Sequence, residues 1–140
     1  MVISNVSSGT ISFENTRFVP EKYYEELPDI RIPQLNDILF TVTGSFGIVI
    51  PVDISADFCF QRHMALVKPM QLLNNAFLCQ TLSTPLIFDQ CKRKATGTAQ
   101  KTVGLQTLRS LLLPIPPLAE QKRIVAEIEK VLSLQRTMHR

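Results

Sequence analysis

The chain has 140 residues, of which 45% are hydrophobic and 19% are charged, and its net charge is +3. These proportions are typical of a globular protein and exclude an intrinsically disordered one. No apolar run approaches the roughly 18 residues that a membrane-spanning helix needs, and the first residues do not have the pattern of a signal peptide. Three cysteines without close pairing favour a reducing, cytoplasmic setting. We expect one domain with an appendage.

The charge is divided unevenly along the chain. Residues 1–91 contain five Lys or Arg and nine Asp or Glu, whereas residues 92–140 contain ten and three. A basic half joined to an acidic half indicates an anionic partner on one side, and nucleic acid is the first candidate. The alternative is that several of the C-terminal charges belong to the solvated face of a helix.

The N-terminal segment is predicted to be polar and strand-like. Residues 9–13 and 16–19 favour short strands because they contain β-branched and aromatic side chains. The acidic segment 20–29 is bounded by prolines and is typical of a loop or a single helical turn.

A β-hairpin is expected next. Residues 37–43 and 48–52 are rich in β-branched side chains and flank a Gly-Ser-Phe-Gly turn. Gly44 and Gly47 permit positive φ angles and a close approach of the backbone to another group. Residues 58–69 form a third strand-like run.

The apolar period becomes helical after residue 72. Residues 73–82 place leucines and a phenylalanine on one helical face, and Thr84-Pro85 is a typical start for a second helix that ends in three basic residues. A polar loop covers residues 95–104, and residues 105–113 favour a helical turn followed by a short strand. The expected fold is α+β, with an irregular mixed sheet and short helices before a long C-terminal helix.

The C-terminal helix begins after a proline bridge. Residues 1–113 are expected to form the head, residues 114–117 the bridge and residues 118–140 the helix. Prolines hold the bridge extended and stiff, so the helix leaves the head at a set angle. Its apolar face is too wide for one shallow packing surface, which favours coiled-coil pairing with a second long helix over a helix folded back on its own core. The expected interface residues are Leu118, Gln121, Ile124, Val125, Ile128, Val131, Leu132 and Gln135.

Four stretches resemble, in order, the specificity subunits of type I restriction–modification enzymes. "NDILFTVTGSFGIVI" is similar to a Gly-Asp-Ile-Leu strand with a Thr-Gly-Ser-x-Gly turn, and "FQRHMALVKP" to a Gln-Arg-His strand that ends in proline. "KATGTAQKTVGLQTLRSLLLPIP" resembles a Thr-Gly-x-x-Gln loop that leads to a proline bridge. "LLLPIPPLAEQKRIVAEIEKV" resembles the end of a target recognition domain and the start of its spacer helix. Asn36 and Gly104 depart from the family pattern, which usually has glycine and a capping Ser or Asn there.

The resemblance implies a non-catalytic module that reads one half of a split sequence in double-stranded DNA. It implies methyltransferase subunits as partners and, through them, a restriction subunit, with no cofactor, metal or membrane. The chain is either a fragment of a two-domain subunit or a half subunit that forms a homodimer through the C-terminal helix. The alternative function is a helical dimerisation or subunit-mimic protein that does not read DNA. The sequence lacks a Gly-rich phosphate loop and a nucleophile–base pair, so no catalytic residue is expected.

The expected DNA contacts combine cations, hydroxyls and amides. Cations bind phosphates, and forked amide or guanidinium donors match base edges in the major groove. Three alternatives remain: an internal pair of Arg62 with Asp57, a core role for Phe46, and a basic triplet that merely ends a helix favourably. The expected residues are Thr43, Ser45, Phe46, Arg62, Lys92, Arg93, Lys94, Thr96, Thr98, Gln100, Lys101 and Thr102.

Overall fold

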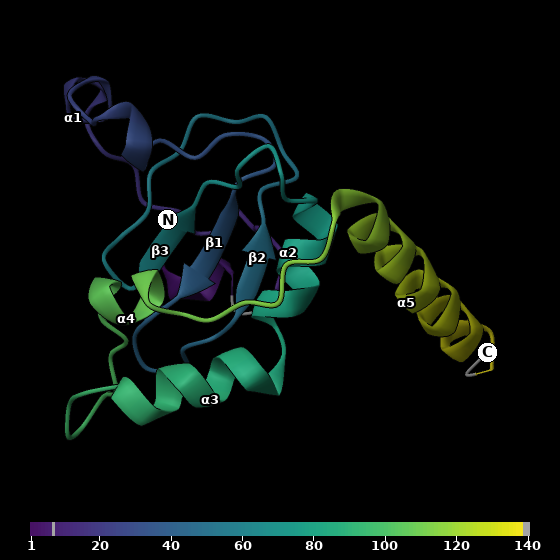
Figure 1. The fold of residues 1–140 in the computed structure, drawn as a ribbon. Helices are drawn as coiled ribbons and strands as arrows, with labels where there is room; N and C mark the ends of the chain where they lie inside the picture. Colours follow the sequence, from purple (N-terminus) through teal and green to yellow (C-terminus); the bar gives the residue numbers. More distant parts are fainter. Residues whose placement is uncertain (7, 139–140) are drawn as a thin grey trace.

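The computed structural model of the protein describes residues 1–6 and 8–138. Figure 1 shows a small sheet with helices around it and a long C-terminal helix that extends away from the sheet. The α+β class and the long terminal helix are therefore confirmed. In chain order the elements are a 3-10 turn (Ile3–Asn5), α1 (Glu21–Glu25), a second 3-10 turn (Asp29–Arg31), β1 (Ile38–Thr41), β2 (Val49–Pro51), β3 (Met64–Val67), α2 (Asn75–Leu82), α3 (Pro85–Lys94), α4 (Leu105–Arg109) and α5 (Leu118–Met138).

Strand β1 lies at the centre of the sheet. The strand order is β2-β1-β3 and both pairings are antiparallel, so the sheet is simpler than the mixed sheet we expected. Alternate side chains of a strand point to opposite faces. Ile38 and Phe40 enter the core that α2 and α3 cover, whereas Leu39 enters a second core with Val6 and Phe58. Because both faces are covered, every residue of β1 is buried, and three of its four residues are apolar.

Two short helices follow the sheet: α3 begins at Pro85, as the sequence predicts, and α2 begins at Asn75, two residues after the expected start. The side chain of Asn74 caps α2 by accepting a hydrogen bond from the backbone N–H of Phe77 at 3.0 Å. Pro85 occupies the first turn of α3, where its missing N–H costs no hydrogen bond. Ile87 and Cys91 then point into the core, one turn apart.

Three expected strands are wrong within the described residues. Residues 9–13 and 16–19 form no ladder, because the backbone there pairs locally with Asn5: Ser12 donates its N–H to the Asn5 carbonyl at 2.8 Å. The strand expected after α4 is also missing. The side-chain amide of Gln90 accepts from the N–H of Leu112 at 2.9 Å and donates to its carbonyl at 3.0 Å. These are the two groups that a neighbouring strand would need.

Helix α5 leaves the head through the proline bridge. Its first turns contact α2, and the rest of the helix projects into solvent (Figure 1). From Val131 to Met138 every residue is exposed. The alternative of a helix folded back along its own core is therefore wrong for this chain.

An ion pair between buried Asp37 and half-buried Lys68 holds the segment before β1. Lys68 contacts the Asp37 carboxylate at 2.6 Å and donates a hydrogen bond to the Ile32 carbonyl at 3.0 Å. Asp37 also accepts from the N–H of Gln34 at 2.9 Å. The pair thus joins the end of β3 to the loop that enters β1.

Replacing Lys68 by methionine should destabilise the fold by about 2–3 kcal/mol, because the buried Asp37 carboxylate would lose its cation partner. Urea unfolding followed by circular dichroism measures the change. Lys22→Met is the control, since Lys22 and Glu26 are exposed and 3.8 Å apart, and we expect a change below about 0.5 kcal/mol. Equal effects of the two substitutions would contradict the structural role of the Asp37–Lys68 pair.

Candidate nucleic-acid interface

The turn between β1 and β2 is braced from inside by Thr41. Its hydroxyl donates to the carbonyl of Ser45 at 2.8 Å and accepts from the N–H of Ile48 at 2.9 Å. Gly44 and Gly47 have φ angles of 72° and 90°, as the turn prediction requires. Sequence reasoning assigned Thr41 only to the strand. Its bracing role shows in no sequence pattern, because threonine is also a common strand residue.

The polar loop after α3 closes into a miniature hairpin. Thr96 and Thr102 exchange two backbone hydrogen bonds of 3.0 and 2.8 Å. Gly97 stands in the bend with φ of 107°, and a Cβ atom there would lie 2.3 Å from the Gln100 carbonyl oxygen. The loop geometry therefore requires glycine at this position.

These two loops are joined into one surface, although they are far apart in the sequence. Gly44 donates its N–H to the carbonyl of Lys101 at 2.8 Å, and Val103 donates to the carbonyl of Val42 at 2.8 Å. Gln100 lies directly over Gly44, since a Cβ on that glycine would be 3.0 Å from the Gln100 side-chain nitrogen. Figure 1 shows the 96–102 loop between α3 and α4, at the end of the sheet where β1 ends.

The joined loops expose most of the side chains predicted to contact DNA. Thr43 is buried, and Phe46 and Thr102 are half-buried. The hydroxyl of Thr43 lies 3.4 Å from that of Thr102, so these two threonines connect the loops. The other predicted residues of the two loops that are exposed are Ser45, Thr96, Thr98, Gln100 and Lys101.

Phe46 is half-buried and packs against the head. Its ring stacks on that of Phe88 of α3 with 5.3 Å between centroids, and it packs against the core that contains Ile87. Gly47 lies under the same ring of Phe88. The core role that we considered as the alternative for Phe46 is thus the one the structure supports.

Arg62 is exposed in the turn that precedes β3, at the same end of the sheet as the joined loops. The next residue, His63, accepts a backbone hydrogen bond from Val42 at 2.9 Å. Arg62 forms no ion pair with Asp57 within the described part of the chain. Asp57 lies beside Tyr24, whose pKa is raised by burial and by this neighbouring carboxylate.

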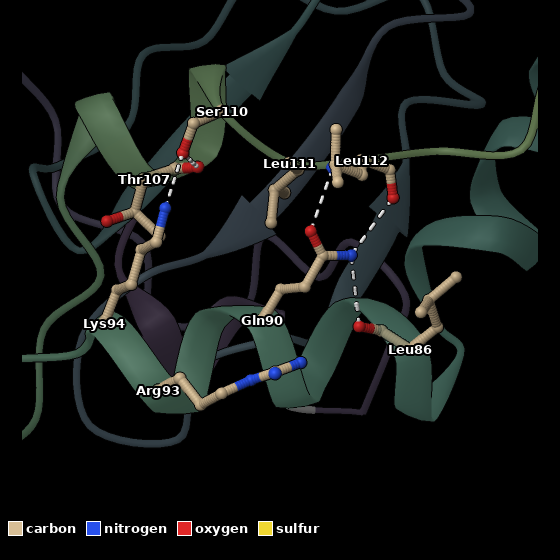
Figure 2. A pocket seen from close by; sticks show the side chains of 8 residues that line it. All are labelled: Leu86, Gln90, Arg93, Lys94, Thr107, Ser110, Leu111 and Leu112. Carbon is tan, nitrogen blue, oxygen red and sulfur yellow. Dashed lines mark hydrogen bonds between the residues drawn. The ribbon is translucent and has the colours of Figure 1, made fainter.

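A groove of about 390 Å³ separates α3 from α4 and the segment that follows it. Figure 2 shows Arg93 and Lys94 along its α3 wall, and the ammonium of Lys94 donates to the hydroxyl of Ser110 at 3.2 Å. Thr107 also lines the groove. Arg93 and Lys94 are therefore on a wall next to the polar loop, and sequence reasoning missed Thr107 and Ser110 because they fall in a predicted structural turn.

The residues expected at a helix–helix interface fall into three groups. Gln121 is fully buried against its own head, so it does not belong to a surface for a partner helix. Ile124, Val125 and Ile128 are half-buried. Leu118, Val131, Leu132 and Gln135 are exposed, as are Leu134 and Met138 further along the helix.

Within residues 1–6 and 8–138, no cluster of three or more His, Cys, Asp or Glu side chains is placed to hold a metal ion. None of the helices described there is long and apolar enough to cross a membrane. Burial raises the pKa of the Cys79 thiol to about 11 and also raises that of Cys91.

The chain thus combines a small α+β head, exposed polar loops at one end of its sheet and a projecting helix. Residues 5–139 match the family described as the type I restriction modification DNA specificity domain. The chain belongs to this family.

Individual relatives agree with this assignment. The specificity subunit of the type I restriction enzyme EcoBI from Escherichia coli is 23% identical over 132 residues, and that of MjaVIII from Methanocaldococcus jannaschii is 23% identical over 137 residues. Each match covers 94% of this chain but only 28% and 32% of the relative. The crystal structure of the HsdS subunit from Thermoanaerobacter tengcongensis shares the fold, with a TM-score of 0.73 and 20% identity over 98% of this chain and 36% of that one.

Replacing Gly97 by alanine should destabilise the polar loop by about 2 kcal/mol, because the new Cβ would meet a backbone oxygen at a positive φ angle. Thermal unfolding measures this cost. Gly104→Ala is the matched control: its φ is −74° and a Cβ there meets nothing within 4 Å, so a change of no more than about 0.5 kcal/mol is expected. A tolerated Gly97→Ala would show that the loop does not need this turn.

Proposed function

We propose that the head binds double-stranded DNA through the joined loops and reads one half of a split recognition sequence. The observation that carries the proposal is the set of backbone hydrogen bonds that joins the 43–47 turn to the 96–102 loop. It presents hydroxyls, an amide and a cation from both loops on one exposed face at the end of the sheet. Phosphate contacts position a protein on DNA, and hydrogen bonds to base edges supply sequence information.

The cations next to this face supply the expected affinity for phosphates. Lys92, Arg93 and Lys94 end α3 and are exposed, and Lys101 lies in the polar loop. The ammonium of Lys94 donates to the hydroxyl of Ser110 and forms no ion pair with any residue that the structure describes. Bound phosphates would release counterions from the DNA, which makes binding dependent on salt.

Gln100 is the leading candidate for a base contact. Its side chain lies over Gly44, where the absence of a Cβ leaves room for it, and it is exposed. An amide pairs in two places with the N6 and N7 edge of adenine in the major groove. Arg62 is the corresponding candidate for guanine.

Helix α5 is proposed to hold this head at a set distance from a second recognition element and to assist in recruiting methyltransferase subunits. Val131 is 56% exposed and Met138 83% exposed, and a soluble helix rarely leaves such a row of apolar side chains uncovered. A second long helix, from another domain or another copy of the chain, covers a surface of this shape. The exposed row also supports the second candidate function, a dimerisation or subunit-mimic protein that does not read DNA.

Alanine at Lys92, Arg93 and Lys101 together should weaken DNA binding by at least tenfold and flatten its salt dependence. Each lost phosphate contact lowers the log–log salt slope by about 0.9. Fluorescence anisotropy on duplex DNA, in complex with the methyltransferase subunits of the same system, measures both quantities.

The matched control removes three exposed cations far from the loops, by changing Arg17, Lys22 and Arg31 to alanine. It should leave affinity and slope close to those of the wild type. If both triple variants bind alike, the basic loop is not the DNA contact, and unaltered binding with an intact helix interface would favour the second candidate function.

Aspartate at Ile128 and Leu132 should abolish pairing through α5, because two charges would be buried against the partner helix. Sedimentation equilibrium should show a lower mass than for the wild-type chain, or loss of the complex with methyltransferase subunits. The control places the same charges on the opposite face, at Ala126 and Ser133, which are both exposed. Equal masses for both variants and the wild type would exclude pairing through this face.

A further inference from the structure

Gln121 is a buried amide whose side chain makes three hydrogen bonds, with two residues just before α2 and with one residue of the proline bridge. The residue is 0% exposed. Its Oε1 accepts from the backbone N–H of Asn74 at 2.8 Å. Its Nε2 donates to the carbonyl of Leu72 at 3.0 Å and to that of Pro116 at 2.8 Å. Both amide protons and one oxygen lone pair are thus satisfied.

These bonds connect α5 to the start of α2. Asn74, which binds Gln121 through its N–H, also caps α2 through its side chain and accepts from Leu78 at 2.9 Å. Helix α2 in turn buries Phe77 and Leu78 in the head. The first turn of α5 is therefore tied by hydrogen bonds to an element that belongs to the core.

The proline bridge is held at its other end by Gln90, whose amide makes two hydrogen bonds with the backbone of Leu112 (Figure 2). Between Leu112 and Gln121 stand three prolines, whose ring fixes φ at about −65°. Few backbone rotations remain in a segment that is stiff in the middle and bonded at both ends.

Apolar packing alone gives α5 little directional control. Near the joint, Ile124 and Val125 are only half-buried, and Leu118 is 37% exposed. Hydrophobic contact is non-directional, whereas hydrogen bonds weaken steeply as their angles depart from linearity. The three side-chain bonds of Gln121 supply directional contacts at this joint.

We propose that Gln121 is a positioning residue that sets the direction in which α5 leaves the head. The proposal rests on the function proposed above, in which α5 spaces two recognition elements. Helix α5 has 21 residues, so at 1.5 Å per residue it is about 31 Å long. A tilt of about 10° at the joint displaces its far end by about 5 Å, more than the 3.4 Å step between neighbouring base pairs.

The test measures the angle directly and without DNA. Spin labels are placed at Asp89→Cys on α3 and Arg136→Cys on α5, both exposed positions, in a Cys59→Ser background. Burial raises the pKa of Cys79 to about 11 and also that of Cys91, so both label slowly at neutral pH. Labelled protein is diluted with unlabelled protein to remove distances between copies, and pulsed electron paramagnetic resonance gives the distance distribution.

The wild-type chain should give one narrow distance. Gln121→Met, which keeps the length of the side chain but loses all three hydrogen bonds, should at least double the width of the distribution or shift it by about 5 Å. Gln106→Met is the matched control on an exposed site of α4, and its distribution should equal that of the wild type. A narrow, unshifted distance for Gln121→Met would overturn the proposal and leave the prolines as the determinant.

Gln121→Glu separates positioning from simple loss of stability and carries the test if Gln121→Met fails to fold. Its carboxylate keeps the acceptor for Asn74 but has no proton for Leu72 or Pro116. Burial raises the pKa of such a carboxyl, and once protonated it donates one hydrogen bond. The distribution should therefore be broad at pH 8 and narrow at pH 5, while that of the wild type stays constant. A width that does not change with pH would overturn the proposal. Failure to bind DNA would refute the proposed function and leave these distances as they are.

Discussion

The structure depends on strand β1, which is paired on both edges and covered on both faces. Its hydrogen bonding continues beyond the last ladder residue, where Val42 and Gly44 receive the polar loop that follows α3. At its other end, Asn36 pairs with Val52, and its carbonyl accepts from the side chain of Asn75 in α2. The predicted DNA surface and the α2–α5 joint are thus attached to opposite ends of one rigid strand.

This arrangement explains how a small head serves two geometric tasks. Loops tolerate sequence change well when a scaffold fixes their ends, so the side chains of the 43–47 turn and the 96–102 loop can change without disturbing the core. The joint to α5 has the opposite requirement, because any change in its direction is amplified along the helix. It is accordingly built from prolines and from two glutamines, Gln90 and Gln121, whose hydrogen bonds have defined directions.

The acidic and basic side chains of the head also lie at different ends. The acidic arm around α1 stands at the end of the head away from α3, whereas the basic triplet of α3 and Lys101 flank the polar loops (Figure 1). Glu120 and Arg123 pair on the surface of α5, where the hydrogen bond from Arg123 lowers the pKa of the glutamate. Such exposed pairs add little stability, and the apolar stripe of α5 beyond them stays exposed.

The sequence by itself determined the class of the fold, the central hairpin, the two short helices and the long terminal helix, because period and capping residues are local properties of the chain. It also indicated which polar loops to examine. Only the tertiary structure decided which of the predicted residues are exposed. Thr43 connects the two loops, Phe46 stacks on Phe88, and Gln121 of α5 is buried against the head. Each of these outcomes depends on residues distant in the sequence. The same holds for the predicted strand after α4, which does not form because the side chain of Gln90 hydrogen-bonds the backbone of Leu112. Local patterns indicate which hydrogen bonds a side chain is able to make, and only the folded chain determines which partner lies within reach.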